Sequence, residues 1–213
     1  SSLASAKVLL NAAVKAGAPE NCIQWIEDPS IEATNALMNH PKVSLILATG
    51  GSSMVKAAYS CGKPAIGVGP GNAPCYIETS ANLKRACTDL MLSKTFDNGM
   101  ICASEQAVVV DRVISRMFED YMKENNCYFL NPQEIEKVSD FVINSQTGFV
   151  NSKVVGQSAF WIAGQAGVEV PENTKILLAR LQDVGPEYPL SREKLSPVLA
   201  YYVVEDYKEG FDI

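Results

Sequence analysis

Residues 43–53 read VSLILATGGSS, which predicts a buried β-strand, a turn of small residues and the start of a helix. A second apolar stretch, KPAIGV at residues 63–68, predicts the next strand, and the segment between the two predicts a helix that ends near Gly62. A strand, a helix and a second strand in this order are typical of a parallel sheet with crossover helices. The stretch therefore predicts an α/β protein.

The alternation of helices and strands continues on both sides of this stretch. Helices are expected at about residues 3–16, 30–38, 80–96, 112–123 and 132–143, and strands at about 22–26, 106–110, 175–181 and 198–204. A loop at residues 97–99 divides the chain into two α/β parts, residues 1–96 and 97–213. No further element is expected after the last strand, and this abrupt end favours a fragment of a longer protein.

Composition and charge argue against several classes of protein. The chain has 213 residues and a net charge of −6, whereas a nucleic-acid-binding surface needs a basic footprint. No apolar run approaches the roughly 20 residues that span a bilayer, and the N-terminal helix lacks the basic leader of a signal peptide. A globular protein without a nucleic-acid or membrane partner is therefore expected.

The six cysteines form no disulfide or zinc-binding pattern. They contain no C-x-x-C pair and are accompanied by a single histidine, His40. Free thiols in a reducing cytoplasm, with no metal site, are the simplest expectation.

Two glycine-rich turns have the composition of a ligand-binding backbone. Thr49, Gly50 and Gly51 would line the first turn, where backbone N–H groups and a helix dipole favour a pyrophosphate. The motif is neither G-x-G-x-x-G nor a P-loop, so a plain tight connection is the alternative. The second cluster, GVGPGN at residues 67–72, indicates either a close approach to the backbone or a structural bulge.

Cys102 is the candidate nucleophile. It follows an Asn-Gly turn and precedes an expected strand, so nearby backbone N–H groups can favour a thiolate and hold an oxyanion. The alternative is a small buried apolar residue, which is the ordinary role of a lone cysteine and the one expected for the other five. No histidine lies near Cys102 in the sequence, and a surface role is expected for His40, so a cysteine–histidine pair is not expected.

Four motifs carry a resemblance to a known family. They are ILATGG at residues 46–51, GKPAIGVG at 62–69, KTFDNGMICASEQ at 94–106 and EKLSP at 193–197. In this order they resemble the aldehyde dehydrogenase half of bifunctional aldehyde-alcohol dehydrogenases, and the similarity covers essentially the whole chain. The FDNG-x-IC-x-SEQ stretch resembles the CoA-acylating branch of the aldehyde dehydrogenase superfamily in particular.

The resemblance implies an NAD-dependent enzyme that interconverts acetaldehyde, coenzyme A and NAD⁺ with acetyl-CoA and NADH. Residues 1–96 would be part of a Rossmann-like NAD-binding domain, and residues 97–213 part of an α/β catalytic domain. Cys102 would form a thioester that coenzyme A discharges, and Glu193 would accept hydrogen bonds from the nicotinamide ribose. The implied cofactor-binding residues are Thr49, Gly50, Gly51, Gly67, Gly69, Glu193 and Leu195.

One departure from the wider superfamily supports the acylating branch. Hydrolytic aldehyde dehydrogenases carry a glutamate that activates water, and the matching position here is about Gly67. Without that base, a thiol is the more plausible acceptor of the acyl group, because it brings its own nucleophilicity.

The resemblance also bears on completeness and assembly. The family's upstream segment, its downstream glycine-rich segment and any alcohol dehydrogenase domain are absent, which again implies a fragment. A cytoplasmic homo-oligomer is implied, and filaments in the full-length enzyme. Three alternatives stay open: a monofunctional acylating dehydrogenase for another aldehyde such as succinate semialdehyde, a catalytically inactive assembly piece, and a bare nucleotide-binding module with an inert Cys102.

Overall fold

The computed structural model describes residues 2–213, which pack into two compact units. The first unit ends at Gly69 and the second runs from Pro70 to Ile213. The boundary between the two packed units lies inside the GVGPGN cluster and not after Phe96. Residues 70–96 pack with the second unit, because they include the strand at residues 73–77 that pairs into its sheet. Which unit binds the cofactor and which carries the catalytic centre stays a prediction.

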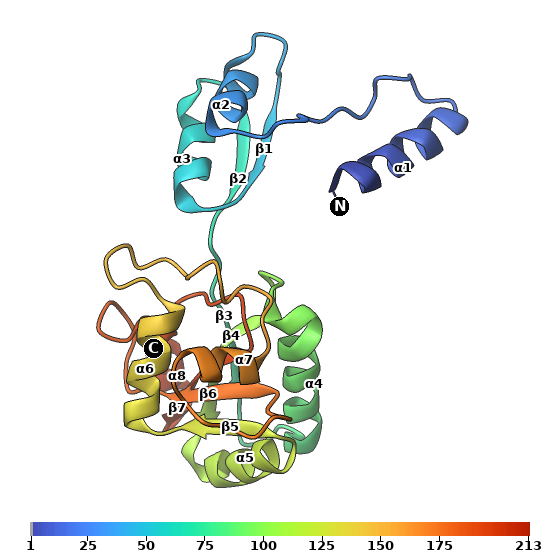
Figure 1. The fold of residues 1–213 in the computed structure, drawn as a ribbon. Helices are drawn as coiled ribbons and strands as arrows, with labels where there is room; N and C mark the ends of the chain where they lie inside the picture. Colours follow the sequence, from blue (N-terminus) through green and yellow to red (C-terminus); the bar gives the residue numbers. More distant parts are fainter. Residues whose placement is uncertain (1) are drawn as a thin grey trace. The chain divides into compact units, whose positions relative to one another are not determined.

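The first unit is a small α/β arrangement. Its elements are α1 (Ser2–Lys15), α2 (Ile31–Asn39), β1 (Ile46–Thr49), α3 (Ser52–Ser60) and β2 (Ala65–Val68). The two strands pair in parallel, and α2 and α3 lie beside them (Figure 1). A small apolar core joins α2, β1 and α3.

The strand expected at residues 22–26 does not form. Cys22 N–H donates to the carbonyl of Pro19, which closes a turn, and residues 22–26 contain no buried side chain. A strand needs backbone partners, and within residues 2–213 this segment pairs with no other strand. The expected cap of the next helix is confirmed, because the Ser30 hydroxyl accepts from Ala33 N–H at 3.0 Å.

The second unit is a five-stranded parallel sheet with helices on both faces (Figure 1). Its strand order is β3-β4-β7-β6-β5, and every pair of neighbours is parallel. The predicted α/β class is confirmed. In chain order the elements are β3 (Ala73–Ile77), α4 (Leu83–Thr95), the 3₁₀ helix η1 (Phe96–Gly99), β4 (Glu105–Asp111), α5 (Arg112–Glu124), β5 (Cys127–Leu130), α6 (Pro132–Val142), α7 (Ala159–Gln165), β6 (Ile176–Arg180), the 3₁₀ helix η2 (Pro189–Ser191), β7 (Val198–Val204) and α8 (Tyr207–Asp212).

Four short elements of this unit were not expected from the sequence, namely β3, β5, α7 and α8. β3 contains Pro74, and β5 has only four residues, so neither gives a clear strand pattern by itself. The two helices have seven and six residues. Because α8 follows β7, the expectation that no element follows the last strand was wrong.

The sheet is buried on both faces because its side chains alternate between two cores. Val108 and Val110 of β4 pack with α4 and α5, whereas Ala107 and Val109 pack with α6 and α7. The two strands β6 and β7 follow the same alternation and are almost wholly buried. Such strands are apolar along their whole length, as expected of a parallel sheet covered by helices.

Parallel pairing also brings three loops together at the amino edge of the sheet. The register aligns β4 with β3 on one side and with β7 on the other. The segments that lead into these strands, residues 70–72, 99–104 and 193–197, therefore meet at one edge. This edge contains Cys102.

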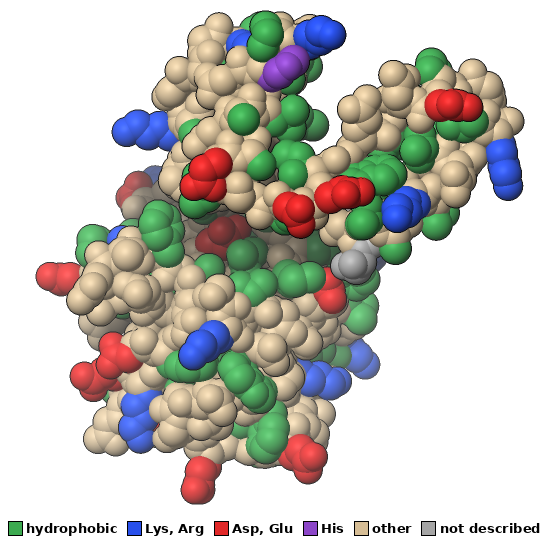
Figure 2. Space-filling model, turned by 45° about the horizontal axis from the view of Figure 1, so that its top comes forward, with side chains coloured by type: hydrophobic (Ala, Val, Ile, Leu, Met, Phe, Trp, Pro, Cys, Tyr) green, Lys and Arg blue, Asp and Glu red, His purple; other side chains and the backbone are tan. Residues whose placement is uncertain are grey.

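The length of the helices and the basic side chains on one face bear on the question of a membrane or nucleic-acid partner. No helix within residues 2–213 is long and apolar enough to cross a bilayer. On the face drawn in Figure 2, the described Lys and Arg side chains are dispersed and form no continuous basic patch.

Candidate active site

Cys102 lies exposed in the turn between η1 and β4. Ser104 N–H closes this turn by donating to the carbonyl of Ile101 at 3.0 Å. Within the described residues, the backbone N–H groups of Cys102 and Ala103 donate no hydrogen bond. A thiol beside free amides can be acylated, and the amides can stabilise an oxyanion there.

The six cysteines, all free thiols, differ in exposure. Cys87 and Cys127 are buried, and burial raises the pKa of the Cys87 thiol to about 11 and that of Cys127 to about 12. Two more are partly buried, while Cys22 is exposed. Exposure therefore separates Cys102 from four of the other five, but not from Cys22.

A left-handed turn precedes Cys102. Asp97, Asn98 and Gly99 of η1 have φ angles of 48°, 51° and 68°. Left-handed backbone costs energy for residues that carry a side chain, so such a run persists only where its surroundings hold it. A Cβ on Gly99 would lie 2.8 Å from the carbonyl oxygen of Ser196, so the turn presses directly on the segment before β7.

The side chain of Asn98 fixes this turn to a further loop. Its Nδ2 donates to the carbonyl of Gly156 at 2.9 Å, and Gly156 N–H donates to the carbonyl of Leu195 at 3.3 Å. Leu195 is itself left-handed, with φ of 45°. The loop around Gly156, between α6 and α7, therefore belongs to the candidate site, although no motif in the sequence indicated it.

Glu193 lies next to the nucleophile segment. Its Oε1 accepts from Gly71 N–H at 3.3 Å, and a Cβ on Gly71 would lie 3.7 Å from the carbonyl oxygen of Cys102. Asn72 Nδ2 donates to the carbonyl of Ser191 at 2.8 Å, which joins the same two segments a second time. The second unit thus brings Cys102 and Glu193 to one edge of the sheet.

Two buried polar side chains join these segments from inside. Gln106 donates to the carbonyl of Ser104 at 3.2 Å and accepts from Lys194 N–H at 3.0 Å. The Lys194 ammonium donates to the carbonyls of Leu190 and Arg192, and burial lowers its pKa well below the usual value. The sequence predicts a strand at Gln106 but gives no sign of this bridge.

The small-residue turn lies in the first unit, at the carboxyl end of β1. Gly51 is the N-cap of α3, with φ of −64°, and no atom lies within 4 Å of the position that its Cβ would take. Thr49 is exposed, and a Cβ on Gly50 would meet only the flexible Met54 side chain. Packing therefore does not require glycine at position 51. The first N–H groups of α3 have no partner within the helix and favour an anion.

A groove of about 580 Å³ runs between α2 and α3 in the same unit. Its lining is mostly apolar and includes Ile31 and Met38 of α2 together with Ala57 of α3. Ser53 and Met54 belong both to this groove and to the first turn of α3. The groove therefore adjoins the N-terminal end of α3.

Gly67 and Gly69 differ in what surrounds them. A Cβ on Gly67 would lie 2.6 Å from Val55 and 2.8 Å from Tyr59, so glycine at this position lets α3 pack on β2. Gly67 N–H also donates to the Tyr59 hydroxyl at 2.9 Å. Gly69 has no atom within 4 Å of its Cβ position. Gly67 is therefore needed for the packing of α3 on β2, a role that was not expected from the sequence.

His40 and the acidic side chains give no indication of a metal centre in the described part of the chain. His40 is the C-cap of α2 in the first unit, whereas Cys102 belongs to the second. Across residues 2–213, no three His, Cys, Asp or Glu side chains are grouped so that they could hold a metal ion.

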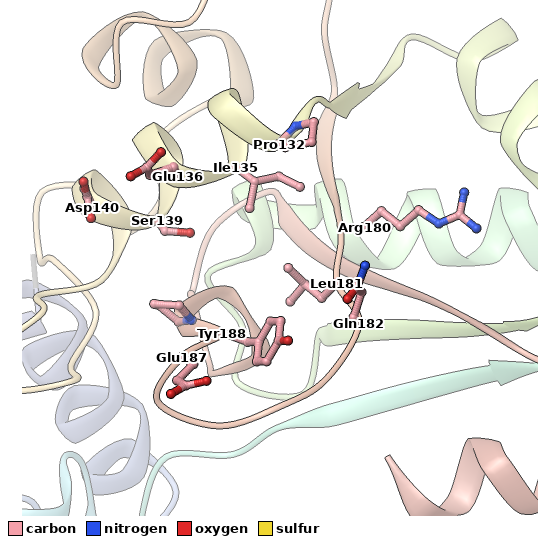
Figure 3. A pocket seen from close by; sticks show the side chains of 11 residues that line it. Pro132, Ile135, Glu136, Ser139, Asp140, Arg180, Leu181, Gln182, Glu187 and Tyr188 are labelled. Atoms are coloured by element: carbon pink, nitrogen blue, oxygen red, sulfur yellow. The ribbon is translucent and has the colours of Figure 1, made fainter.

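A cavity lies at the carboxyl edge of the five-stranded sheet, which is the edge away from Cys102. It has a volume of about 460 Å³ and lies between α6, the end of β6 and the loop before η2 (Figure 3). Ile135 and Leu181 line it with apolar surface, and Glu136 and Glu187 add carboxylates (Figure 3). None of these residues belongs to the four sequence motifs, so the cavity is separate from the candidate active site.

Comparison with known proteins places the chain among aldehyde dehydrogenases. The model of the aldehyde dehydrogenase family matches residues 1–127. The aldehyde-alcohol dehydrogenase of Streptococcus pneumoniae serotype 4 is 52% identical over 217 residues, which cover 99% of this chain and 25% of that protein. An acetylating aldehyde dehydrogenase from Geobacillus thermoglucosidasius superimposes with a TM-score of 0.92 at 48% identity, over 97% of this chain and 45% of that one.

A third relative was solved with ligands. The propionaldehyde dehydrogenase of Rhodopseudomonas palustris, with bound CoA and an acylated cysteine, has a TM-score of 0.85 at 35% identity, over 97% of this chain and 46% of that one. The chain thus spans about a quarter of the bifunctional relative and just under half of the two solved enzymes. The resemblance drawn from the four motifs is confirmed.

Proposed function

This chain belongs to the aldehyde dehydrogenase family, and on that premise we propose that it is the nucleophile-bearing part of an NAD-dependent, CoA-acylating acetaldehyde dehydrogenase. The observation that carries the proposal is the exposed Cys102 thiol, which follows a left-handed turn and lies beside free backbone amides. The 52% identity to an aldehyde-alcohol dehydrogenase supports the N-terminal part of a bifunctional enzyme.

The chemistry proposed at Cys102 has three steps. The thiolate adds to the aldehyde carbonyl and gives a thiohemiacetal, whose oxygen the amides of Cys102 and Ala103 can stabilise. NAD⁺, when bound, supplies the acceptor for a hydride, and loss of that hydride leaves a thioester on Cys102. The thiol of coenzyme A then attacks the thioester, so that acyl-CoA leaves and Cys102 returns to the thiolate.

The first unit has the features that fit the adenosine end of a dinucleotide. The N–H groups at the start of α3 suit a pyrophosphate, and the adjoining apolar groove suits the flat adenine ring. The open space at Gly51 leaves room for the ligand beside Thr49 and Gly50. In the second unit, we assign Glu193 and Leu195 to the nicotinamide end.

Coenzyme A is the proposed acyl acceptor because β2 and the turn after it carry no general base. A carboxylate at Gly67 would point into α3, and residues 68–72 contain no acid. A thiol needs no base at this position, since it ionises more readily than water and is the stronger nucleophile.

The test uses the full-length natural protein that contains this chain. Acetyl-CoA should be reduced with oxidation of NADH, and after brief exposure to acetyl-CoA alone, peptide mass spectrometry should find the acetyl group on Cys102. Cys102→Ser should abolish both signals, while Cys22→Ser, which removes the other exposed thiol, should keep them. NADH oxidation that survives in Cys102→Ser would overturn the proposal.

The preference for acetaldehyde and the assembly state need separate measurements. A higher kcat/KM for succinyl-CoA than for acetyl-CoA would favour a monofunctional enzyme for succinate semialdehyde. NADH binding without acylation of Cys102 would favour a bare nucleotide-binding module. A protein that forms filaments without any acylation would instead be an assembly piece.

A further inference from the structure

Lys94 is a buried cation that the proposed chemistry does not use. It lies in the last turn of α4, directly before η1, and its side chain is fully buried. Within the described residues, its Nζ has no hydrogen-bond partner and no carboxylate oxygen within 4.0 Å. Removing an ammonium group from water without a partner costs free energy, so a buried Lys94 indicates that nearby charges compensate part of this cost.

The charges around Lys94 explain how it is tolerated. Burial lowers the pKa of Lys94 to about 7, and the carboxylates of Glu105 and Glu193 oppose this shift. Lys194 is a second buried cation that interacts electrostatically with Lys94. Two lysines and two glutamates therefore interact as a group whose formal charges cancel, and Lys94 and Glu105 flank the segment that carries Cys102 in the sequence.

The two lysines of this group have different surroundings. The Lys194 ammonium is satisfied by two backbone carbonyls and so holds the segment before β7 in shape. Lys94 makes no such contact, and its charge is free to act on the carboxylates at longer range. Glu105 and Glu193 are both partly buried, and Glu193 is the one that accepts a hydrogen bond from Gly71 beside Cys102.

We propose that Lys94 is a positioning residue for cofactor binding, whose buried positive charge holds the Glu193 carboxylate toward Gly71. The inference rests on the proposed function, because that function assigns Glu193 to the nicotinamide ribose. A charge acts beyond hydrogen-bond distance here because the low dielectric of a protein interior screens it weakly. Cofactor binding is therefore tightest while Lys94 carries its proton.

The pH dependence has a defined sign. Because the pKa of Lys94 in the free protein is about 7, the ammonium loses its proton as the pH rises through this value, and NADH then binds less tightly. A tenfold change in Kd corresponds to an upward shift of about one unit in the pKa of Lys94 on binding. The charged groups that face Lys94 are Glu105, Glu193 and Lys194.

The experiment measures the Kd of NADH between about pH 6 and pH 9 in the full-length natural protein, with four versions compared. These are the unchanged protein, Lys94→Met, Glu193→Gln and the double variant. Methionine fills a buried lysine site without charge, and urea unfolding checks that each variant folds. Lys94→Met should raise the Kd of NADH by about tenfold near pH 6 and should remove the change in Kd near pH 7. In a protein that already carries Glu193→Gln, the same substitution should have no further effect on the Kd.

The outcomes separate a positioning role from a structural one. A pH step in the Kd of NADH that persists in Lys94→Met, or losses that simply add in the double variant, would overturn the inference, since a lysine that only fills space would affect NADH binding equally at every pH and independently of Glu193. If Glu193→Gln binds NADH as tightly as the unchanged protein, the proposed cofactor role of Glu193 fails first, and the inference fails with it.

Discussion

Cys102 shares its exposure with Cys22, so reactivity at Cys102 has to be tested against that second thiol. Iodoacetamide should modify both in the folded protein, whereas the buried Cys87 and Cys127, with raised pKa values, should react only after unfolding. Prior addition of acetyl-CoA should protect Cys102 and leave Cys22 unchanged, as followed by peptide mass spectrometry. Equal protection of both thiols would remove the case for acyl entry at Cys102.

Gly51 is a residue at which binding and folding can be separated. Its φ of −64° suits any L-residue, and a Cβ there meets nothing within 4 Å. Gly51→Val should therefore lower the free energy of unfolding by no more than about 1–2 kcal/mol, the usual cost of an apolar N-cap. It should weaken NADH binding by about tenfold or more, because the new side chain takes the place of the pyrophosphate.

The matched control for Gly51 is Gly67 in the neighbouring strand. Gly67→Ala places a Cβ 2.6 Å from Val55, so it should lower the free energy of unfolding of the first unit. Fluorescence titration with NADH and urea unfolding measure the two effects in each variant. Normal NADH binding by a folded Gly51→Val protein would show that the turn has only a structural role.

At the scale of an element, the left-handed turn η1 determines where Cys102 lies. Gly99 and Gly167 have nearly the same φ, 68° and 71°, so alanine costs about 1–2 kcal/mol at either position. At Gly99 the new Cβ would also lie 2.8 Å from the carbonyl oxygen of Ser196, whereas at Gly167 nothing lies within 4 Å. Gly99→Ala should therefore be the more destabilising by about 1–3 kcal/mol in urea unfolding. Equal losses at the two positions would mean that η1 does not press on the segment before β7.

The elements with long apolar patterns were predictable, and the short ones were not. β7 was predicted at residues 198–204, where it is found, and α5 and α6 end within one residue of their predicted positions. α6 has a strong local signal, because Asn131 and Glu134 form a capping box. β3 and β5 become strands only by pairing with a neighbour in the sheet, and no local pattern specifies that pairing.

The candidate site divides in the same way. From its turn alone Cys102 could be either a nucleophile or a small apolar residue, and the resemblance favoured the nucleophile, while Glu193 was proposed only through the resemblance. Asn98 and Gln106 act through contacts to residues 58 and 88 positions away. Local motifs cannot show such contacts, because they exist only after the sheet has formed and the loops around it have packed.

At the scale of the whole molecule, burial of Lys94 couples stability to pH. Its pKa of about 7 in the folded protein lies below the ordinary value of 10.5, so between these values the unfolded chain binds more protons and stability rises with pH. Lys94→Met removes this dependence. The gain in unfolding free energy that it gives should be largest below pH 7 and should shrink as the pH rises toward 10.5. Urea unfolding on both sides of pH 7 measures it, and an equal gain at both would contradict the lowered pKa.

The choice of acyl acceptor, a property of the whole enzyme, depends on whether the position that matches the water-activating glutamate of hydrolytic relatives carries a base. No acid occurs from Gly67 to Asn72, and general-base assistance typically contributes about 10²–10⁴-fold to attack by water. The thioester on Cys102 should therefore persist in water and be discharged by coenzyme A.

Acetaldehyde and NAD⁺ without coenzyme A should accordingly give a burst of NADH near one equivalent per active site, followed by little turnover. Addition of coenzyme A should restore steady production of NADH together with acetyl-CoA, followed by absorbance and by product analysis. In Cys102→Ala the burst itself should vanish while NADH still binds, because the thiol forms the intermediate but does not hold the cofactor. Steady NADH formation with free acetate and no coenzyme A would show that water is the acceptor, and a base outside residues 67–72 would then have to be found.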